Sequence, residues 1–171
     1  MHISHILQNS LECNSEARIA QIDFKAAFDR ISHAGLIFKL KSIGVGGPLL
    51  SVLTDFLLNR RHYVVVDGCN SNFANVVSGV PQGSVLGPLL FILYTSDLGF
   101  ITENLLVSYA DDSTLIAVCD KACNRQSITD SLNCDLNVIS EWCNTWGMVI
   151  NPAKSKSMIV SRSRTINPVF S

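Results

Sequence analysis

The stretch LLVSYADDSTLIAVC, residues 105–119, decides the fold. It holds two apolar, β-rich runs, residues 105–110 and 114–119, on either side of Asp111 and Asp112. Two such runs around a short polar segment predict a β-hairpin whose tight turn lies at the two aspartates. Side chains alternate between the faces of a strand, but a tight turn can aim two successive carboxylates at one point.

A second short strand pattern, residues 18–23, also ends in a carboxylate, Asp23. If this strand lies beside the hairpin, Asp23 and Asp111 converge at one edge of the sheet. Clustered carboxylates repel unless a cation neutralises them, and Mg²⁺ prefers a few carboxylates together with substrate phosphates. The spacing is compatible with a metal site, but ordinary cap and turn residues produce the same pattern, so both interpretations stay open here.

The remaining segments predict helices and further strands. Helical spacing and helix start and stop residues predict helices over residues 3–11, 34–43, 48–58, 85–101 and 128–146. β-rich runs predict a second hairpin from residues 63–66 and 73–77 with a longer loop, and short strands at 148–150 and 157–160. This order predicts an α+β fold, a mainly antiparallel sheet with helices packed on one face. The backing helices are those around Leu89–Leu98 and Ile128–Trp146.

Composition excludes several classes of protein. The 171 residues carry 13 Lys and Arg against 14 Asp and Glu, which excludes a basic nucleic-acid arm but allows a local basic patch. Apolar residues make up 47% and charged residues 16%, so intrinsic disorder is excluded and some apolar surface is expected to be covered by other protein. The longest apolar stretch is far too short to span a bilayer, and no signal peptide is expected.

The six cysteines are expected to be structural thiols. They form no Cys-x-x-Cys pair and sit mostly among apolar neighbours, and Cys119 with Cys123 makes a poor zinc site. This usage predicts a reduced, intracellular protein, in the nucleus or the cytoplasm.

Four motifs, in order along the chain, resemble those of reverse transcriptases. QIDFKAAFD at residues 21–29 resembles motif A, and SGVPQGSVLGPLLF at 78–91 resembles motif B. YADD at 109–112 resembles motif C, and WGM at 146–148 followed by NPAK at 151–154 resembles motif D. The wording is most similar to polymerases of non-LTR (LINE-type) retrotransposons. The resemblance covers residues 1–162 and leaves 163–171 as a C-terminal tail.

The resemblance implies the palm of a right-handed polymerase and an RNA-directed DNA polymerase activity. The implied reaction is two-metal nucleotidyl transfer from a deoxynucleoside triphosphate to a DNA primer 3′-hydroxyl on an RNA template. By resemblance, Asp23 and Asp111 are the metal ligands and Asp112 is the supporting carboxylate. Two Mg²⁺ ions, with Mn²⁺ as a substitute, are the implied cofactors.

The resemblance also implies residues that contact the nucleotide sugar and base. Phe28 matches the aromatic sugar gate that selects deoxynucleotides. Phe24, four residues earlier, is a further candidate, with core packing as the alternative for both. Gln82 matches the motif B glutamine near the incoming nucleotide, and Gly83 belongs to a loop that backbone and ligand can approach closely.

Charged residues supply the remaining candidates. Lys154 matches the motif D lysine that meets the triphosphate and protonates the leaving pyrophosphate, with Lys156 as a competitor. Lys25 and Asp29 are interpreted as a charge pair at or behind the surface. The basic cluster Arg60, Arg61 and His62 either touches a nucleic-acid backbone or forms a solvated hairpin edge.

By the resemblance, we expect residues 1–162 to lack most of the family's upstream fingers and all of its downstream thumb. We therefore expect a truncated palm that is joined to fingers and thumb when active. The alternative is a retroelement remnant without polymerase activity of its own, or an interaction module. An intron maturase or an RNA-templated RNA polymerase is disfavoured by Phe28 and by the wording of motifs A and B.

Overall fold

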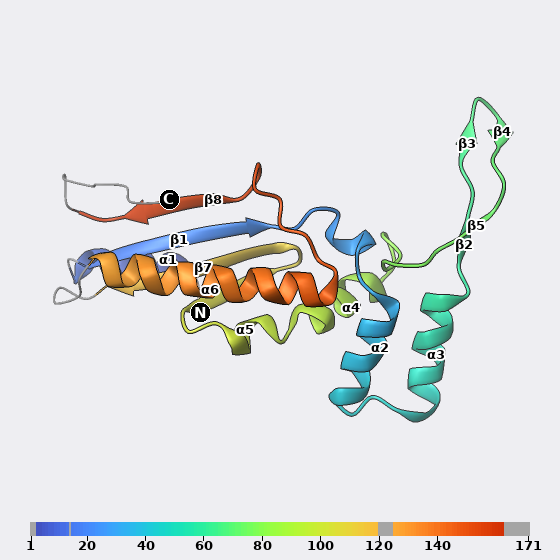
Figure 1. Cartoon of the computed structure of the whole chain (residues 1–171), viewed down its shortest axis with the longest axis horizontal. Helices are drawn as coiled ribbons and strands as arrows, with labels where there is room; N and C mark the ends of the chain where they lie inside the picture. Colours follow the sequence, from blue (N-terminus) through green and yellow to red (C-terminus); the bar gives the residue numbers. More distant parts are fainter. Residues whose placement is uncertain (1–2, 14, 120–124, 163–171) are drawn as a thin grey trace. The chain divides into compact units, whose positions relative to one another are not determined.

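The computed structural model describes residues 3–13, 15–119 and 125–162 (Figure 1). The chain divides into two compact units, which are described separately. We name residues 1–25, 96–145 and 149–171 the sheet unit, and residues 26–95 and 146–148 the helix–arm unit. The predicted tail, residues 163–171, and Cys123 lie outside the described residues.

A four-stranded antiparallel sheet forms the centre of the sheet unit. Its strands are β1 (Glu16–Asp23), β6 (Leu105–Tyr109), β7 (Asp112–Cys119) and β8 (Lys156–Val160), in the spatial order β6-β7-β1-β8. β1 pairs with β7 along its whole length, from Glu16 opposite Cys119 to Asp23 opposite Asp112. The predicted α+β class, with a mainly antiparallel sheet, is confirmed.

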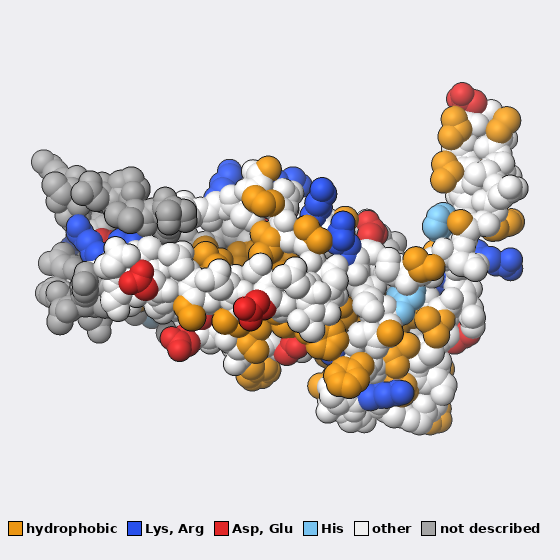
Figure 2. Space-filling model, viewed as in Figure 1, with side chains coloured by type: hydrophobic (Ala, Val, Ile, Leu, Met, Phe, Trp, Pro, Cys, Tyr) orange, Lys and Arg blue, Asp and Glu red, His pale blue; other side chains and the backbone are white. Residues whose placement is uncertain are grey.

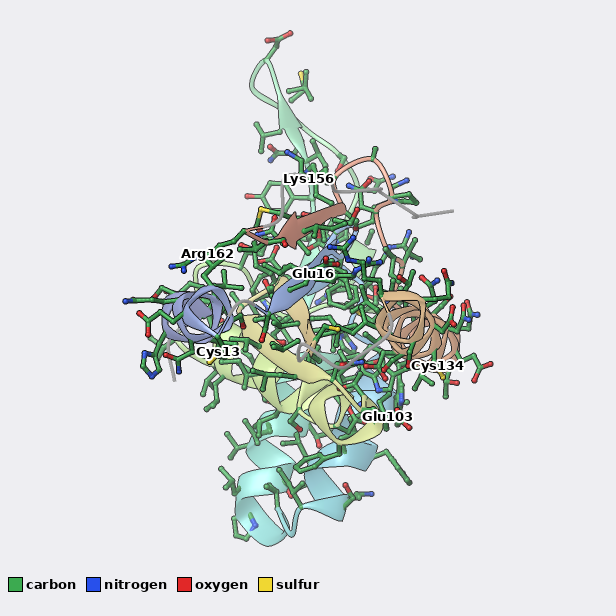
Figure 3. The ribbon with its side chains drawn as sticks, turned by 90° about the vertical axis from the view of Figure 1, so that its left-hand side faces the viewer. Cys13, Glu16, Glu103, Cys134, Lys156 and Arg162 are labelled. Carbon is green, nitrogen blue, oxygen red and sulfur yellow. The ribbon has the colours of Figure 1, made fainter. Side chains whose placement is uncertain are left out.

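Helices cover both faces of this sheet. The long helix α6 (Arg125–Trp146) lies on one face and α1 (Ile3–Glu12) on the other, with Cys134 and Cys13 marking the two sides in Figure 3. Four successive residues of β1, Ala17 to Ala20, are buried, as expected for a strand covered on both faces. The apolar stripe of α6 packs as its spacing predicts, and α1 adds the second layer. The short helix α5 (Leu98–Ile101) contacts β6.

A buried ionic cluster ties α6 to β1. Arg18 is only 2% exposed, and its side chain donates from Nε to Glu16 Oε1 at 2.9 Å and from Nη1 to Thr129 Oγ1. Arg125 Nε lies 3.0 Å from the other Glu16 oxygen. Because each buried charge has a partner, this arginine is tolerated in the core and sets the position of the first turns of α6.

Three longer helices and a hairpin build the helix–arm unit. α2 (His33–Ser42) packs against α3 (Gly47–Leu58) and α4 (Leu86–Thr95), and the one-turn helix η1 (Ala27–Asp29) precedes them. The core contains Leu36, Leu40, Leu57, Leu90 and Tyr94. We name residues 60–77 the arm; it holds β2 (Arg61–His62) paired with β5 (Ala74–Asn75) and β3 (Val65–Val66) paired with β4 (Cys69–Asn70).

A buried lysine packs against Tyr94 and Trp146 within this unit. Lys39 Nζ donates to the Tyr94 carbonyl at 2.6 Å and lies 3.9 Å from the centroid of the Trp146 ring. Tyr94 Oη donates to the Trp146 carbonyl at 2.5 Å. The ammonium is satisfied by a carbonyl and two aromatic faces, which makes its burial tolerable.

Three expectations about the hairpins and the short strands are wrong. The tight turn of the first hairpin is at Ala110 and Asp111, because Ala110 takes a left-handed φ of 52°, and Asp112 already belongs to β7. The segment expected to be the long loop of the arm, residues 67–72, contains β4, which pairs with β3, and it turns at Asp67 and Gly68, both at positive φ. The residues 148–150 form a single bridge, Phe24 with Ile150, and not a strand.

The apolar segment 85–101 forms two helices where one was expected. α4 ends at Thr95, whose hydroxyl donates back to the Phe91 carbonyl at 3.1 Å, and α5 begins after Asp97. Thr, Ser and Asp side chains compete for backbone groups and so weaken a helix at this point. No helix among the described residues is long and apolar enough to cross a membrane.

Candidate active site

Asp23 and Asp112 lie opposite each other in the sheet. Asp23 is the last residue of β1 and Asp112 the first of β7, and the register pairs them directly. Directly opposed residues of antiparallel strands project from the same face, with Cβ atoms about 4.5–5.5 Å apart. The fold therefore brings together two carboxylates from segments that are far apart in the sequence.

The loop after α6 is tied to the same end of β1. The Asn151 N–H donates to the Asp23 carbonyl at 2.8 Å, and the Asp23 N–H donates to Ser155 Oγ at 3.2 Å. Lys154 lies between these two anchored residues. These two hydrogen bonds hold the segment that carries the Lys154 ammonium near the paired carboxylates. The sequence did not predict that Asn151 and Ser155 would make them.

A small cavity of about 160 Å³ joins these groups. It is lined by Gln21, Ile22, Asp23, Asp112, Ser113, Thr114 and Lys154. Two acidic groups and one basic group around an open space can hold a cation and an anionic ligand together.

Asp111 lies in the turn directly before Asp112, at the edge of the sheet where β1 ends. It sits in the turn of the hairpin, half-buried, beside Tyr109, which is 86% exposed. It is not among the residues that line the cavity. The residue that the strand register places opposite Asp23 is Asp112. The cause is the turn, which begins one residue earlier than the sequence predicts. The roles of Asp23, Asp111 and Asp112 as metal ligands remain predictions.

In the described part of the chain, no group of three or more His, Cys, Asp and Glu side chains is arranged to hold a metal ion. The donors at this edge of the sheet are the Asp23 and Asp112 carboxylates, with Asp111 in the adjoining turn.

In the helix–arm unit, the end of motif A is bonded to the start of motif B. The Val80 N–H donates to the Phe28 carbonyl at 2.9 Å and the Gly79 N–H to the Ile31 carbonyl at 2.8 Å. Ser78 Oγ donates to the Asp29 carbonyl at 2.9 Å. At Gly79, where φ is +82°, a Cβ would lie 2.8 Å from Asp29 Cα. Glycine is therefore required here on both counts.

This bonding places Phe28, Gln82 and Gly83 in one unit. The half-buried Phe28 ring stacks on Phe91, with centroids 4.8 Å apart. Gln82 is exposed, and its Nε2 donates to Asp29 Oδ1 at 3.0 Å. Gly83 has a φ of +81° and open space where a Cβ would be. Asp29 thus binds Gln82, while Lys25 belongs to the other unit.

Phe24 lies in the sheet unit and is 4% exposed, which agrees with the core-packing alternative. Lys154 and Lys156 are both exposed, and only Lys154 lines the cavity. Lys156 is the first residue of β8, opposite Gln21.

The basic cluster of the arm divides into one structural and two exposed residues. Arg60 Nη2 donates to the Gly79 carbonyl at 2.5 Å and Nε to the Leu57 carbonyl at 3.3 Å, and burial lowers the pKa of Arg60. His33 Nε2 lies 2.8 Å from the same Gly79 carbonyl. Sequence reasoning missed His33 entirely, because nothing local marks it as a partner of motif B. Arg61 and His62 are exposed.

Comparison with known proteins agrees with these motifs. Residues 3–167 match the family described as reverse transcriptase (RNA-dependent DNA polymerase). The RNA-directed DNA polymerase from mobile element jockey of Drosophila funebris is 37% identical over 153 residues, which is 85% of this chain and 16% of that protein. The probable RNA-directed DNA polymerase from transposon BS of Drosophila melanogaster is 35% identical over 177 residues, 99% of this chain and 18% of that protein. The chain thus spans less than a fifth of these relatives.

Solved structures support the fold. The telomerase of Candida albicans, in complex with a TWJ fragment of telomeric RNA, has a TM-score of 0.69 at 18% identity and covers 96% of this chain and 31% of its own. The apo telomerase of Candida tropicalis truncated from its C-terminal domain has a TM-score of 0.66 at 16% identity, covering 96% of this chain and 36% of its own. With the family match over nearly its whole length, the chain belongs to the reverse transcriptase (RNA-dependent DNA polymerase) family, among relatives from non-LTR retrotransposons.

Proposed function

We propose that this chain is the palm of an RNA-directed DNA polymerase and carries its nucleotidyl-transfer site. The observation that carries the proposal is the pairing of Asp23 with Asp112 beside Asp111, at a cavity that Lys154 also lines. Carboxylates at the end of a rigid sheet provide fixed negative charge for a reaction among phosphates. Membership of the reverse transcriptase family supports the choice of reaction.

The donor set fits a hard divalent cation. Carboxylate oxygens suit Mg²⁺, which is usually bound through one or two carboxylates and completes its shell with water and substrate phosphates. We propose that Asp23, Asp111 and Asp112 hold two Mg²⁺ ions, with Mn²⁺ as a substitute. When bound, such ions lower the pKa of the primer 3′-hydroxyl and neutralise charge on the phosphates.

The chain's own residues would orient the nucleotide. We propose that the exposed ammonium of Lys154 pairs with the triphosphate and delivers a proton to the leaving pyrophosphate. Phe28, held by Phe91, would exclude a 2′-hydroxyl, and Gln82, held by Asp29, would contact the nucleotide. Gly83 would leave room for the approach of the ligand to the backbone.

The partners follow from the reaction. We propose an RNA template, a DNA primer and deoxynucleoside triphosphates as substrates, with the fingers and thumb of a longer polymerase completing the binding channel. We also propose a reducing, intracellular setting, as the cysteine usage of the sequence predicts.

Primer extension tests the proposed reaction. The chain is incubated with a DNA primer on an RNA template, Mg²⁺ and deoxynucleotides, beside Asp23→Asn, Asp112→Asn and the matched control Asp130→Asn on the exposed face of α6. We expect the two site variants to lose at least about a thousandfold in rate and the control to keep its rate. Extension that survives in both site variants would contradict the proposal, whereas no extension by the unchanged, folded chain would support the alternative of a remnant without polymerase activity of its own.

Metal binding gives a second readout that needs no turnover. Titration with Mn²⁺, followed by water-proton relaxation, should show binding to the unchanged chain and to Asp130→Asn. Binding should weaken at least tenfold in Asp23→Asn and Asp112→Asn. Equal Mn²⁺ affinity in all four proteins would show that Asp23 and Asp112 are not metal ligands.

A further inference from the structure

An exposed aromatic cluster with an arginine lies on the arm. The Phe73 ring packs edge-on against Tyr63, with centroids 5.1 Å apart, and Arg61 Cζ lies 5.7 Å from the Phe73 centroid. Phe73 is 67% exposed and Tyr63 48% exposed. Large aromatic rings with this exposure do not contribute to a hydrophobic core, and such exposed apolar groups often mark a binding site. The adjacent guanidinium favours an anionic ligand with a ring that can stack.

A cavity of about 700 Å³ adjoins this cluster, because Arg61 lines it as well. Arg60, His33, Asn59 and Asn75 also line it, and the described residues around it include no carboxylate. Arg60 is committed to two backbone carbonyls and contributes a fixed positive charge. Two arginines with amide donors and no acidic residue form an anion-binding surface.

The distribution of charge along the arm indicates which part of it binds an anionic ligand. Its tip turns at Asp67 and Gly68, directly after the valines of β3, whereas its arginines and its histidine lie in the half next to α3. Figure 2 shows this order, with basic side chains low on the arm, hydrophobic ones along it and an acidic one at its end. An anionic partner is therefore attracted to the base of the arm and repelled from its tip.

We propose that the base of the arm binds single-stranded nucleic acid, with phosphates on Arg61 and in the Arg60 cavity and a base stacked on Phe73. Stacking on an aromatic ring beside a basic groove is a general, sequence-tolerant mode of binding single strands. The proposal rests on the proposed function, because an RNA template is the single strand that such a polymerase presents. A protein partner would not require the two arginines and is an outcome of the test.

Fluorescence anisotropy measures the proposed contact. A labelled 12-nucleotide oligouridylate is titrated with the 171-residue chain in EDTA, at several salt concentrations, so that no turnover occurs. Phe73→Ala should weaken binding about tenfold without changing the salt dependence. Arg61→Gln should weaken binding and lower the slope of log K against log salt by about 0.7, the value for one phosphate contact on a single strand.

Matched controls separate this site from general effects. Phe100→Ala removes an aromatic ring that is 89% exposed in the sheet unit, and Lys41→Gln removes an exposed charge at the other end of α2. Both should bind within twofold of the unchanged chain. Phe73→Trp should keep the affinity and Phe73→Leu should not, since leucine preserves hydrophobic packing but cannot stack.

The outcomes that overturn the inference are distinct from failure of the polymerase assignment. No binding of the oligonucleotide, equal affinity in Phe73→Ala, or full affinity in Phe73→Leu would each overturn it, the last pointing to a protein-type surface. If extension fails but the predicted pattern of affinities holds, the arm binds single strands and the catalytic proposal is wrong. If extension succeeds while Phe73 and Arg61 variants bind normally, only the arm proposal is wrong.

Discussion

The two units hold their candidate functional residues by different means. In the sheet unit, strand register places Asp23 opposite Asp112. In the helix–arm unit, Phe28 and Gln82 are placed by hydrogen bonds between two irregular segments, residues 28–31 and 78–82. All residue pairs between two strands help to fix their register, whereas a contact between two loops is fixed by a few hydrogen bonds. Single substitutions should therefore perturb the second arrangement more easily than the first.

The largest effect is expected where two backbones touch in the helix–arm unit. Gly79→Ala adds a Cβ at 2.8 Å from Asp29 Cα and at a φ of +82°, so we expect a loss of about 3 kcal/mol or more in the free energy of unfolding. Urea denaturation gives the size of the loss. Hydrogen exchange should show the Val80 amide losing protection while the β1 and β7 amides keep theirs.

Gly83→Ala is the matched control, because its φ is +81° and a Cβ would have open space. It should cost about 1 kcal/mol from backbone strain alone. Equal losses in both variants would show that the contact with Asp29 contributes nothing.

A smaller effect is expected at one contact on which the sheet unit does depend. The Asp135 carboxylate, 2% exposed, accepts from the Glu103 and Asn104 N–H groups, each at 2.9 Å, just before β6 begins. Asp135→Ala leaves these donors without their acceptor and should cost about 2 kcal/mol of unfolding free energy. Asp130→Ala, on the exposed side of α6, should cost less than about 0.5 kcal/mol. Equal stability of the two variants would contradict the claim that the sheet unit depends on the Asp135 contact.

Two cysteines sharpen the comparison through pH. Burial raises the pKa of the Cys143 thiol in the sheet unit to about 11, above its ordinary value of 9.0. Since the folded pKa is the higher one, this contribution to stability is complete below pH 9 and is lost as the pH rises through 11. By pH 10 the unchanged chain should lose about 1 kcal/mol more than Cys143→Ala. Iodoacetamide at pH 8 should modify the exposed Cys69 of the arm and spare Cys143; equal labelling would contradict the burial.

The smallest effect is expected at the exposed hydrogen bond between Asp29 and Gln82. Asp29→Ala should change the free energy of unfolding by about 0.5 kcal/mol or less, because water replaces an exposed partner. It should raise KM for the deoxynucleotide about threefold with little change in kcat, since the Gln82 amide is no longer oriented. Asp29→Asn keeps an acceptor oxygen and should restore KM. A loss in kcat alone would contradict a positioning role.

Sequence patterns predicted most elements because their signals are local. Gly44 and Gly147, at the predicted helix ends, both take positive φ, and Pro48 lies in the first turn of α3 as expected. The four motifs also identified the family from the sequence alone. One failure follows from a single residue's conformation, the left-handed φ of Ala110 in the hairpin turn. Another is the break between α4 and α5, where the Thr95 hydroxyl donates back to the Phe91 carbonyl.

The sequence by itself determined the family, the order of the main helices and strands, and the residues to examine. Only the tertiary structure decided that Asp112 and not Asp111 faces Asp23, that Lys154 lines their cavity, and that Asp29 binds Gln82, 53 residues away. Periodicity and capping act between neighbours along the chain, so they can be read from it. Register and loop contacts join distant segments, and their outcome depends on a single φ angle or a single missing Cβ.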